Sequence, residues 1–311
     1  MNPSVGPVRF NLMLGISYEG ATAVIATVGA GLRSFEVDGV PYVETFGADE
    51  KPPMSAGAVL VPWPNRTAGA CWVLDGVVQQ LEVTEPARGN AIHGLVRRRA
   101  WAVLEHTGSL VSLRTTIEPQ AGWPAALHVT VSYALDDNGL TVTHGVKNVG
   151  DLATPFGVGT HPYPRAGNAS TDACTLTLAA TTVVPLDVER MVPSGPAVPV
   201  EGTEYDFRSG RGLDGVRLDT PFGGCEPGRD GLVHHSLVAS SGGVEVWADP
   251  AFRWVQVYTP DSYPGRGRAV AIEPMTCPPD ALNSGVDLIW VAPGESWGAR
   301  WGIKPLGASG S

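Results

Sequence analysis

The sequence predicts an all-β protein built as a large antiparallel β-sandwich, and three observations support this prediction. First, 39 glycines and 27 prolines are spread along the 311 residues, and both residue types are costly inside a helix. Second, apolar residues between them alternate with a period of two, as in half-buried strands. Third, turn signals recur about every ten residues from Gly20 to Gly302, which is typical of a sandwich or barrel.

The clearest strands are two alternating segments, Leu110 to Thr116 and Leu127 to Leu135, and a shorter one precedes them at Trp101 and Val103. Pro185 to Asp230 is dense in proline, glycine and charge, so we expect long loops there. With no internal repeat and no linker, the chain is interpreted as a single domain over residues 1–311. Hairpin turns are predicted at Asp75-Gly76, Asp137-Asn138-Gly139 and Ser241-Gly242-Gly243.

The charge balance disfavours a nucleic-acid-binding protein. There are 31 acidic and 21 basic side chains, a formal net charge of −10, and phosphate neutralisation requires a basic face. Hydrophobic residues make up 43% and charged residues 17% of the chain, which is ample material for a packed core and too little charge for a disordered chain.

Two further patterns bear on the compartment. Met1 to Gly20 has no basic segment followed by an apolar run, and no stretch of about 18 consecutive apolar residues occurs anywhere, so we expect a cytoplasmic protein that does not span a membrane. The four cysteines are far apart in the sequence, which fits neither a disulfide framework nor a zinc site. We therefore expect reduced thiols at Cys71, Cys174, Cys225 and Cys277.

Three ionisable residues stand among small or apolar neighbours, where burial without a function is costly. His93 follows a loop with Pro86 and Gly89, and His161 stands between a glycine-rich run and Pro162. Glu273 ends the apolar segment Val270 to Ile272, so we expect its carboxylate at the end of a strand. For each histidine the competing interpretation is a hydrogen-bonded structural residue.

Two arginine segments are interpreted differently. Arg66 closes Val59 to Arg66, which also contains Trp63, so a guanidinium that can bind hydroxyls is expected beside an indole that can stack on a sugar. A structural ion pair is the alternative for Arg66. The triplet from Arg97 to Arg99, just before Trp101, is interpreted as a solvent-exposed strand edge.

Four segments, in this order and spacing, resemble the aldose 1-epimerase, or galactose mutarotase, family. They are Val59 to Arg66, Asn90 to Gly94, Gly157 to Tyr163 and Ile272 to Asn283. The resemblance extends from about Tyr18 to Ile303, and it implies the antiparallel supersandwich fold of that family with an open sugar cleft. Two departures, Thr160-His161-Pro162 and Pro274-Met275, bring the chain closer to a bacterial subgroup of aldose epimerase-related proteins than to the best-known galactose mutarotases.

The resemblance implies interconversion of the α and β anomers of a free aldohexose, with no metal and no other cofactor. Glu273 matches the general base that takes the proton of the C1 hydroxyl, and His161 matches the acid that protonates the ring oxygen. His93 and Arg66 match residues that bind the ring oxygen and hydroxyls, and Asp219 is the nearest candidate for an aspartate that binds sugar hydroxyls. The chemistry suits a carboxylate and an imidazole on opposite sides of the ring.

Three alternatives stay open. His93, His161 and Glu273 could form a 2-His-1-carboxylate iron site, although the usual spacing of such ligands is missing. The same cleft could belong to a carbohydrate-binding protein without catalysis. A hexose-6-phosphate epimerase of the same superfamily would need extra cations at the cleft rim, which Arg165, Arg190 and Arg208 could supply.

Overall fold

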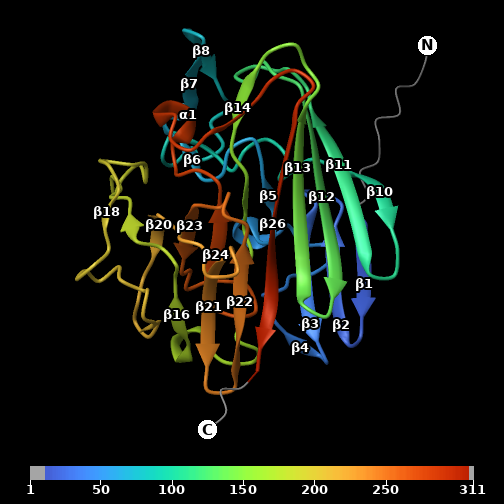
Figure 1. Ribbon diagram of the computed structural model, residues 1–311. Helices are drawn as coiled ribbons and strands as arrows, with labels where there is room; N and C mark the ends of the chain where they lie inside the picture. The colour runs from blue at the N-terminus through green and yellow to red at the C-terminus, as the bar shows by residue number, and fades with distance from the viewer. Residues whose placement is uncertain (1–10, 308–311) are drawn as a thin grey trace.

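A computed structural model describes residues 11–307, and nearly all of its elements are strands (Figure 1). The absence of a leader was predicted from Met1 to Gly20, and residues 1–10 of that segment lie outside the described residues. The largest sheet is antiparallel and has nine strands. In spatial order they are β10 (Ala102–His106), β11 (Leu110–Ile117), β12 (Leu127–Asp136), β13 (Gly139–Asn148), β26 (Ser296–Leu306), β22 (Gly242–Ala248), β21 (Val233–Ala239), β16 (Thr175–Thr177) and β19 (Arg211–Gly212).

A second antiparallel sheet of seven strands carries most of the candidate site. Its order is β18 (Val198–Pro199), β17 (Thr182–Val183), β20 (Asp219–Gly223), β23 (Trp254–Tyr258), β24 (Ala271–Met275), β15 (Gly159–Thr160) and β5 (Val59–Leu60). A third sheet contains β1 (Met13–Tyr18), β2 (Ala21–Ala26), β3 (Gly31–Val37) and β4 (Val40–Pro41).

Shorter elements complete the described chain. Pairs of strands form between β6 (Arg66–Thr67) and β9 (Ala91–Ile92), β7 (Cys71–Leu74) and β8 (Val77–Gln80), and β14 (Thr154–Phe156) and β25 (Ile289–Val291). The β7–β8 hairpin projects from one end of the molecule, with α1 (Ala281–Ser284) packed beside it (Figure 1). Single 3₁₀ turns occur at Pro53–Ser55, Ala68–Ala70 and Thr171–Ala173.

The alternation in the sequence explains the core. Every second residue of β12, from Leu127 to Leu135, is buried while the residues between them are partly exposed, and each such burial contributes about 1.5–3 kcal/mol. The main apolar core draws on all three large sheets, through Ile25, Val131 and Ile272 among others. Because one core joins the three sheets, we propose that the chain forms a single domain.

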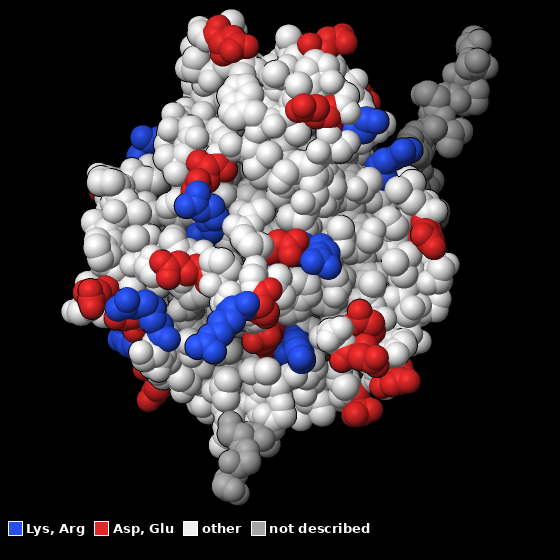
Figure 2. Space-filling model, viewed as in Figure 1, with Lys and Arg blue, Asp and Glu red and all other residues white. Residues whose placement is uncertain are grey.

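The predicted all-β class and the three hairpins are confirmed. Pro185 to Asp230 is mostly loop as expected, but it also contains β20, which pairs with β23 inside the seven-stranded sheet. Within residues 11–307, no helix is long and apolar enough to cross a membrane. On the face shown in Figure 2, basic side chains are interspersed with acidic ones and form no continuous basic patch.

Candidate active site

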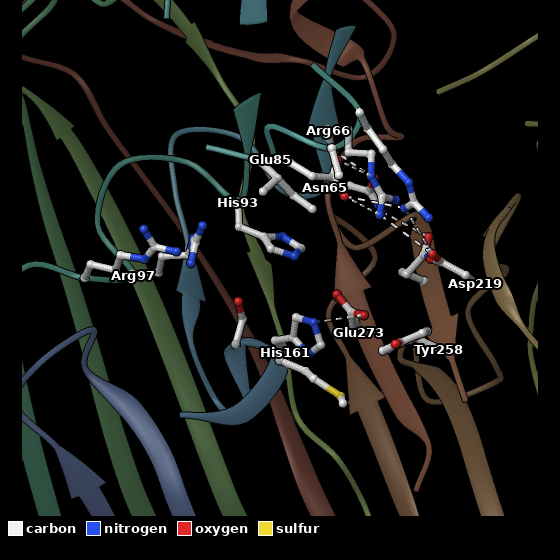
Figure 3. Close-up of a pocket in the computed structure, with 16 residues that line it drawn as sticks. Asn65, Arg66, Glu85, His93, Arg97, His161, Asp219, Tyr258 and Glu273 are labelled. Carbon is white, nitrogen blue, oxygen red and sulfur yellow. Dashed lines mark hydrogen bonds and ion pairs between the residues drawn. The ribbon is translucent and has the colours of Figure 1, made fainter. Parts of the chain in front are cut away.

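A cleft of about 580 Å³ opens over one face of the seven-stranded sheet, a size typical of small-molecule sites. The sheet register explains its floor. Asp219 pairs with Tyr258, and Gln256 pairs with Glu273. Directly paired residues share a face, as do residues two apart on one strand, so these four side chains point to the same side. All four line the cleft (Figure 3).

Glu273 lies in the middle of β24, not at its end as expected from the sequence. The five residues of this strand are all buried, because β24 lies between β23 and β15 and is covered on both faces. The side chain of Glu273 is 1% exposed, and its Oε2 has no hydrogen-bond partner among the described residues. Burial raises the pKa of Glu273 well above its usual range, and the charge of Asp219 adds to that effect.

His161 follows the end of β15, and its backbone is fixed on both sides. Its N–H donates to the Ala58 carbonyl at 3.2 Å, and its own carbonyl accepts from the Gly57 N–H at 2.8 Å. The imidazole stacks on Tyr163 with ring centroids 5.3 Å apart. Burial lowers the pKa of His161 to about 3, so the isolated ring is neutral at neutral pH.

The imidazole and the carboxyl group are neighbours. His161 Nε2 lies 3.5 Å from Glu273 Oε1, so the two groups are side by side and not on opposite sides of a sugar ring. This arrangement suits a hemiacetal, because the two oxygens that exchange protons in anomerisation are both bonded to C1. A proton can therefore be removed at one oxygen and delivered at the other by adjacent groups.

His93 comes to the same place through the β6–β9 pair, in which Arg66 lies opposite Ile92. The His93 backbone is left-handed, with φ of 64°, and its N–H donates to the Asn65 carbonyl at 2.8 Å. Such a conformation is uncommon for a residue other than glycine and often marks a functional site. The His93 ring meets that of His161 edge to face at 5.3 Å, and burial lowers its pKa well below the usual range.

Arg66 lines the cleft and forms the ion pair considered as the alternative for it. Its Nε and Nη2 contact the two oxygens of Glu85 at 2.9 and 3.0 Å, and Nη2 lies 3.7 Å from Asp219 Oδ2. Arg88 contacts the same two carboxylates at 3.4 and 4.0 Å. Asp219 also accepts a 2.7 Å hydrogen bond from Gln256. Arg66 is therefore part of an ion-pair network that forms one wall of the cleft.

Trp63 is placed elsewhere, against the prediction of a stacking surface. Its side chain is 3% exposed, belongs to the apolar core and packs on Trp123 with ring centroids 6.1 Å apart. It does not line this cleft, so it is not available to stack on a sugar there. The proline-stiffened turn that contains it directs Arg66, but not the indole, toward the cleft.

The arginine triplet is also placed differently from the prediction. Arg97 and Arg98 lie in a turn after β9 and line the cleft, while Arg99 donates to the Thr116 carbonyl at 2.7 Å. The expected strand edge was wrong, because these residues lie in a turn, whereas the expected exposure holds for Arg98 and only in part for Arg97 and Arg99. Of the three cations named for a phosphosugar, none lines the cleft: Arg165 lies 3.4 Å from Glu44, and Arg208 pairs with Asp206 at 2.7 Å.

Sequence reasoning also missed several residues that line the cleft, including five with charged, amide or phenol side chains. None was singled out, although Asn65 belongs to the segment Val59 to Arg66, because strand register and loop packing bring them to the site. No group of three or more His, Cys, Asp or Glu side chains within residues 11–307 is arranged to hold a metal ion, so the iron-site alternative has no donor set there. The five missed residues with charged, amide or phenol side chains are Asn65, Glu85, Arg88, Gln256 and Tyr258.

Comparison with known proteins relates this cleft to a family. The sequence profile described as aldose 1-epimerase matches residues 14–304. The uncharacterized protein YihR of Escherichia coli K12 is 34% identical over 274 residues, which cover 88% of this chain and 86% of that protein. Galactose mutarotase of Homo sapiens is 31% identical over 173 residues, which cover 54% of this chain and 49% of that protein.

A solved structure agrees in fold. The GalM/aldose epimerase homologue from C. elegans superposes with a TM-score of 0.84 at 19% identity, covering 96% of this chain and all of that one. The predicted supersandwich fold is thereby confirmed.

Proposed function

The chain belongs to the aldose 1-epimerase family, and on that premise we propose that it is an isomerase that interconverts the α and β anomers of an aldohexose. The observation that carries this proposal is the 3.5 Å approach of His161 Nε2 to Glu273 Oε1 on the floor of a sugar-sized cleft.

In the proposed ring opening, Glu273 takes the proton of the C1 hydroxyl and His161 gives a proton to the ring oxygen. The bond between C1 and the ring oxygen breaks, and an open-chain aldehyde results. Rotation about the C1–C2 bond exposes the other face of the carbonyl. Reclosure returns the ring-oxygen proton to His161 and the Glu273 proton to the new C1 hydroxyl, so no atom is gained or lost.

The pair carries one proton throughout this cycle, which reconciles the proposed roles of the two residues with the electrostatics of the site. Burial raises the pKa of Glu273 and lowers that of His161, so the resting proton is on Glu273. Catalysis by the proposed route begins from the form in which that proton has moved to His161. The two forms belong to one coupled titration and differ only by this transfer.

The remaining cleft residues are proposed to bind the sugar. His93 lies beside His161 and can hydrogen-bond the ring oxygen or a neighbouring hydroxyl. Arg66 and Asp219 offer a donor and an acceptor on the opposite wall (Figure 3). Such contacts hold the pyranose with C1 over the proton-transfer pair and stabilise ground state and transition state alike.

Polarimetry on freshly dissolved α-anomers of a panel of sugars tests the proposal, after subtraction of the spontaneous rate. His161→Asn should lower kcat by about 10²-fold or more. His144→Gln is the matched control, because His144 is equally buried and has its pKa lowered to about 3 but lies in the nine-stranded sheet. Sugar binding without any acceleration by the wild type would instead indicate a carbohydrate-binding protein.

A further inference from the structure

Two arginines in the cleft have no acidic partner. Arg66 and Arg88 are balanced by Glu85 and Asp219. By contrast, no carboxylate within residues 11–307 lies within 4.0 Å of Arg97 or Arg98, although both line the cleft. Burial and the neighbouring charge of Arg98 lower the pKa of Arg97 to about 10. The cleft therefore has an uncompensated positive end.

The turn that carries these arginines is firmly held. Val96 is fully buried, the Arg99 N–H donates to the Val96 carbonyl at 3.0 Å, and the Arg99 carbonyl accepts from the Gly29 N–H at 2.8 Å. A side chain at Gly29 would approach the Arg97 carbonyl to 2.5 Å. Because the backbone is fixed before any ligand arrives, little ordering free energy is lost when the guanidinium groups bind an anion.

The cleft also continues past these arginines. A second cavity of about 590 Å³ shares Met54, Ser55, Arg97 and Arg98 with the first, and Lys51 borders it. Arg97 lies on the far side of His93 and His161 from Asp219 (Figure 3). The acidic and cationic ends of the cleft are therefore separated by the two histidines.

We propose that the preferred substrate is an aldose with an anionic substituent on a carbon remote from C1, and that Arg97 and Arg98 bind this substituent. The inference rests on the proposed function, since it assumes that C1 lies over Glu273 and His161. Guanidinium groups bind phosphate, sulfate and carboxylate through paired, charge-assisted hydrogen bonds. A neutral sugar would leave two cations in the cleft without a counter-charge, a costly arrangement for a partly buried group such as Arg97.

The test compares four probes: glucose, glucose 6-phosphate, glucose 6-sulfate and glucuronate. Anomer exchange is measured at equilibrium by NMR magnetisation transfer. We expect kcat/KM for at least one anionic probe to exceed that for glucose about 10-fold or more, and the ranking of the three anions identifies the substituent. In R97Q/R98Q this preference should fall about 10-fold or more, with most of the change in KM.

Two controls accompany the double variant. Arg208→Gln removes an arginine outside the cleft and should leave the preference unchanged. Arg97→Lys keeps the charge but loses the planar fork, so it should retain part of the preference even if the double variant folds poorly. Raising ionic strength should increase KM for the anionic probes more than for glucose.

The outcomes separate the inference from the proposed function. The inference is overturned if the wild type exchanges the anomers of glucose as fast as or faster than those of the anionic probes. It is also overturned if R97Q/R98Q loses the same factor in kcat/KM on all four probes. Either result leaves the epimerase proposal standing. If the wild type accelerates none of the probes, the epimerase proposal fails for these sugars. Calorimetric binding then decides the inference: anion binding that the double variant loses supports it, and absence of anion binding overturns it.

Discussion

Replacement of Glu273 by glutamine removes the basic oxygen from the proton-transfer pair while leaving its size almost unchanged. The proposed mechanism requires a carboxylate that accepts and returns one proton in each cycle. Loss of such a group typically costs 10²- to 10⁴-fold in rate, which corresponds to about 2.7–5.5 kcal/mol in the activation barrier. We expect kcat to fall by that factor with a much smaller change in KM.

The structure also predicts what happens to stability. Because burial raises the pKa of Glu273, the folded protein holds this side chain in its neutral form, and glutamine replaces one neutral group with another. At low pH, where the unfolded chain also carries the neutral acid, the free energy of unfolding should change by less than about 1 kcal/mol. A carboxyl with a raised pKa stabilises the fold at low pH, and that contribution is lost as pH rises from the unfolded pKa to the folded one. The wild type should therefore lose stability relative to Glu273→Gln as pH rises.

The assay follows anomer exchange on the best wild-type sugar together with thermal unfolding of both proteins. In the wild type, the rate should stay constant between the lowered pKa of His161 and the raised pKa of Glu273, because the pair neither gains nor loses its proton there. A correctly folded Glu273→Gln protein with wild-type turnover would refute the mechanism. A large fall in Tm with normal turnover per folded molecule would show that Glu273 has only a structural role.

Three further predictions test other parts of the molecule. Arg66→Ala should raise KM about 10-fold or more and lower Tm, because it removes a proposed sugar contact and leaves Glu85 without its bidentate partner. Unchanged affinity would assign Arg66 to the ion pair alone. Dialysis against a strong chelator should leave the exchange rate unchanged, whereas loss of activity restored by iron or zinc would favour a metal site. His144→Gln should make the protein more resistant to unfolding by acid. Burial lowers the pKa of His144 to about 3, so below about pH 6.5 the unfolded wild type binds a proton that the folded protein does not, and its free energy of unfolding falls by about 1.4 kcal/mol per pH unit. Calorimetric unfolding of both proteins at several pH values would measure this slope.

The fold was largely predictable because its strands are local patterns. The alternation from Leu127 to Leu135 and the turn at Asp137 to Gly139 specify β12 and its hairpin without reference to the rest of the chain. Dense proline and glycine suggested loops from Pro185 to Asp230, yet β20 forms there because β23 offers it a partner, and no local pattern encodes that pairing.

The cleft was less predictable, because register and loop packing decide which side chains reach it. Trp63 and Arg66 are three residues apart in one proline-rich turn, but only the arginine faces the cleft. Arg97 resembles a surface residue in the sequence, and only the packing of its turn against Gly29 directs it inward. The sequence indicates which chemical groups are present, whereas the tertiary contacts decide which of them have charged partners.

In the proposed mechanism, the adjacent positions of Glu273 and His161 let a buried site carry out a reaction that requires both acid and base. Transfer from C1 hydroxyl to ring oxygen moves one proton onto Glu273 and another off His161, so the pair changes form but keeps its total charge. Ring closure reverses that change. The solvent need not supply or remove a proton during the cycle, so burial does not slow the reaction by limiting proton exchange with water. The same burial raises the pKa of Glu273 and lowers that of His161, and ring opening ends in the form that these shifts favour, with Glu273 protonated and His161 neutral. Because the resting form is that same form, burial leaves the free energy of the open-chain complex unchanged relative to rest, and its cost falls on the first step, in which the proton moves from Glu273 to His161.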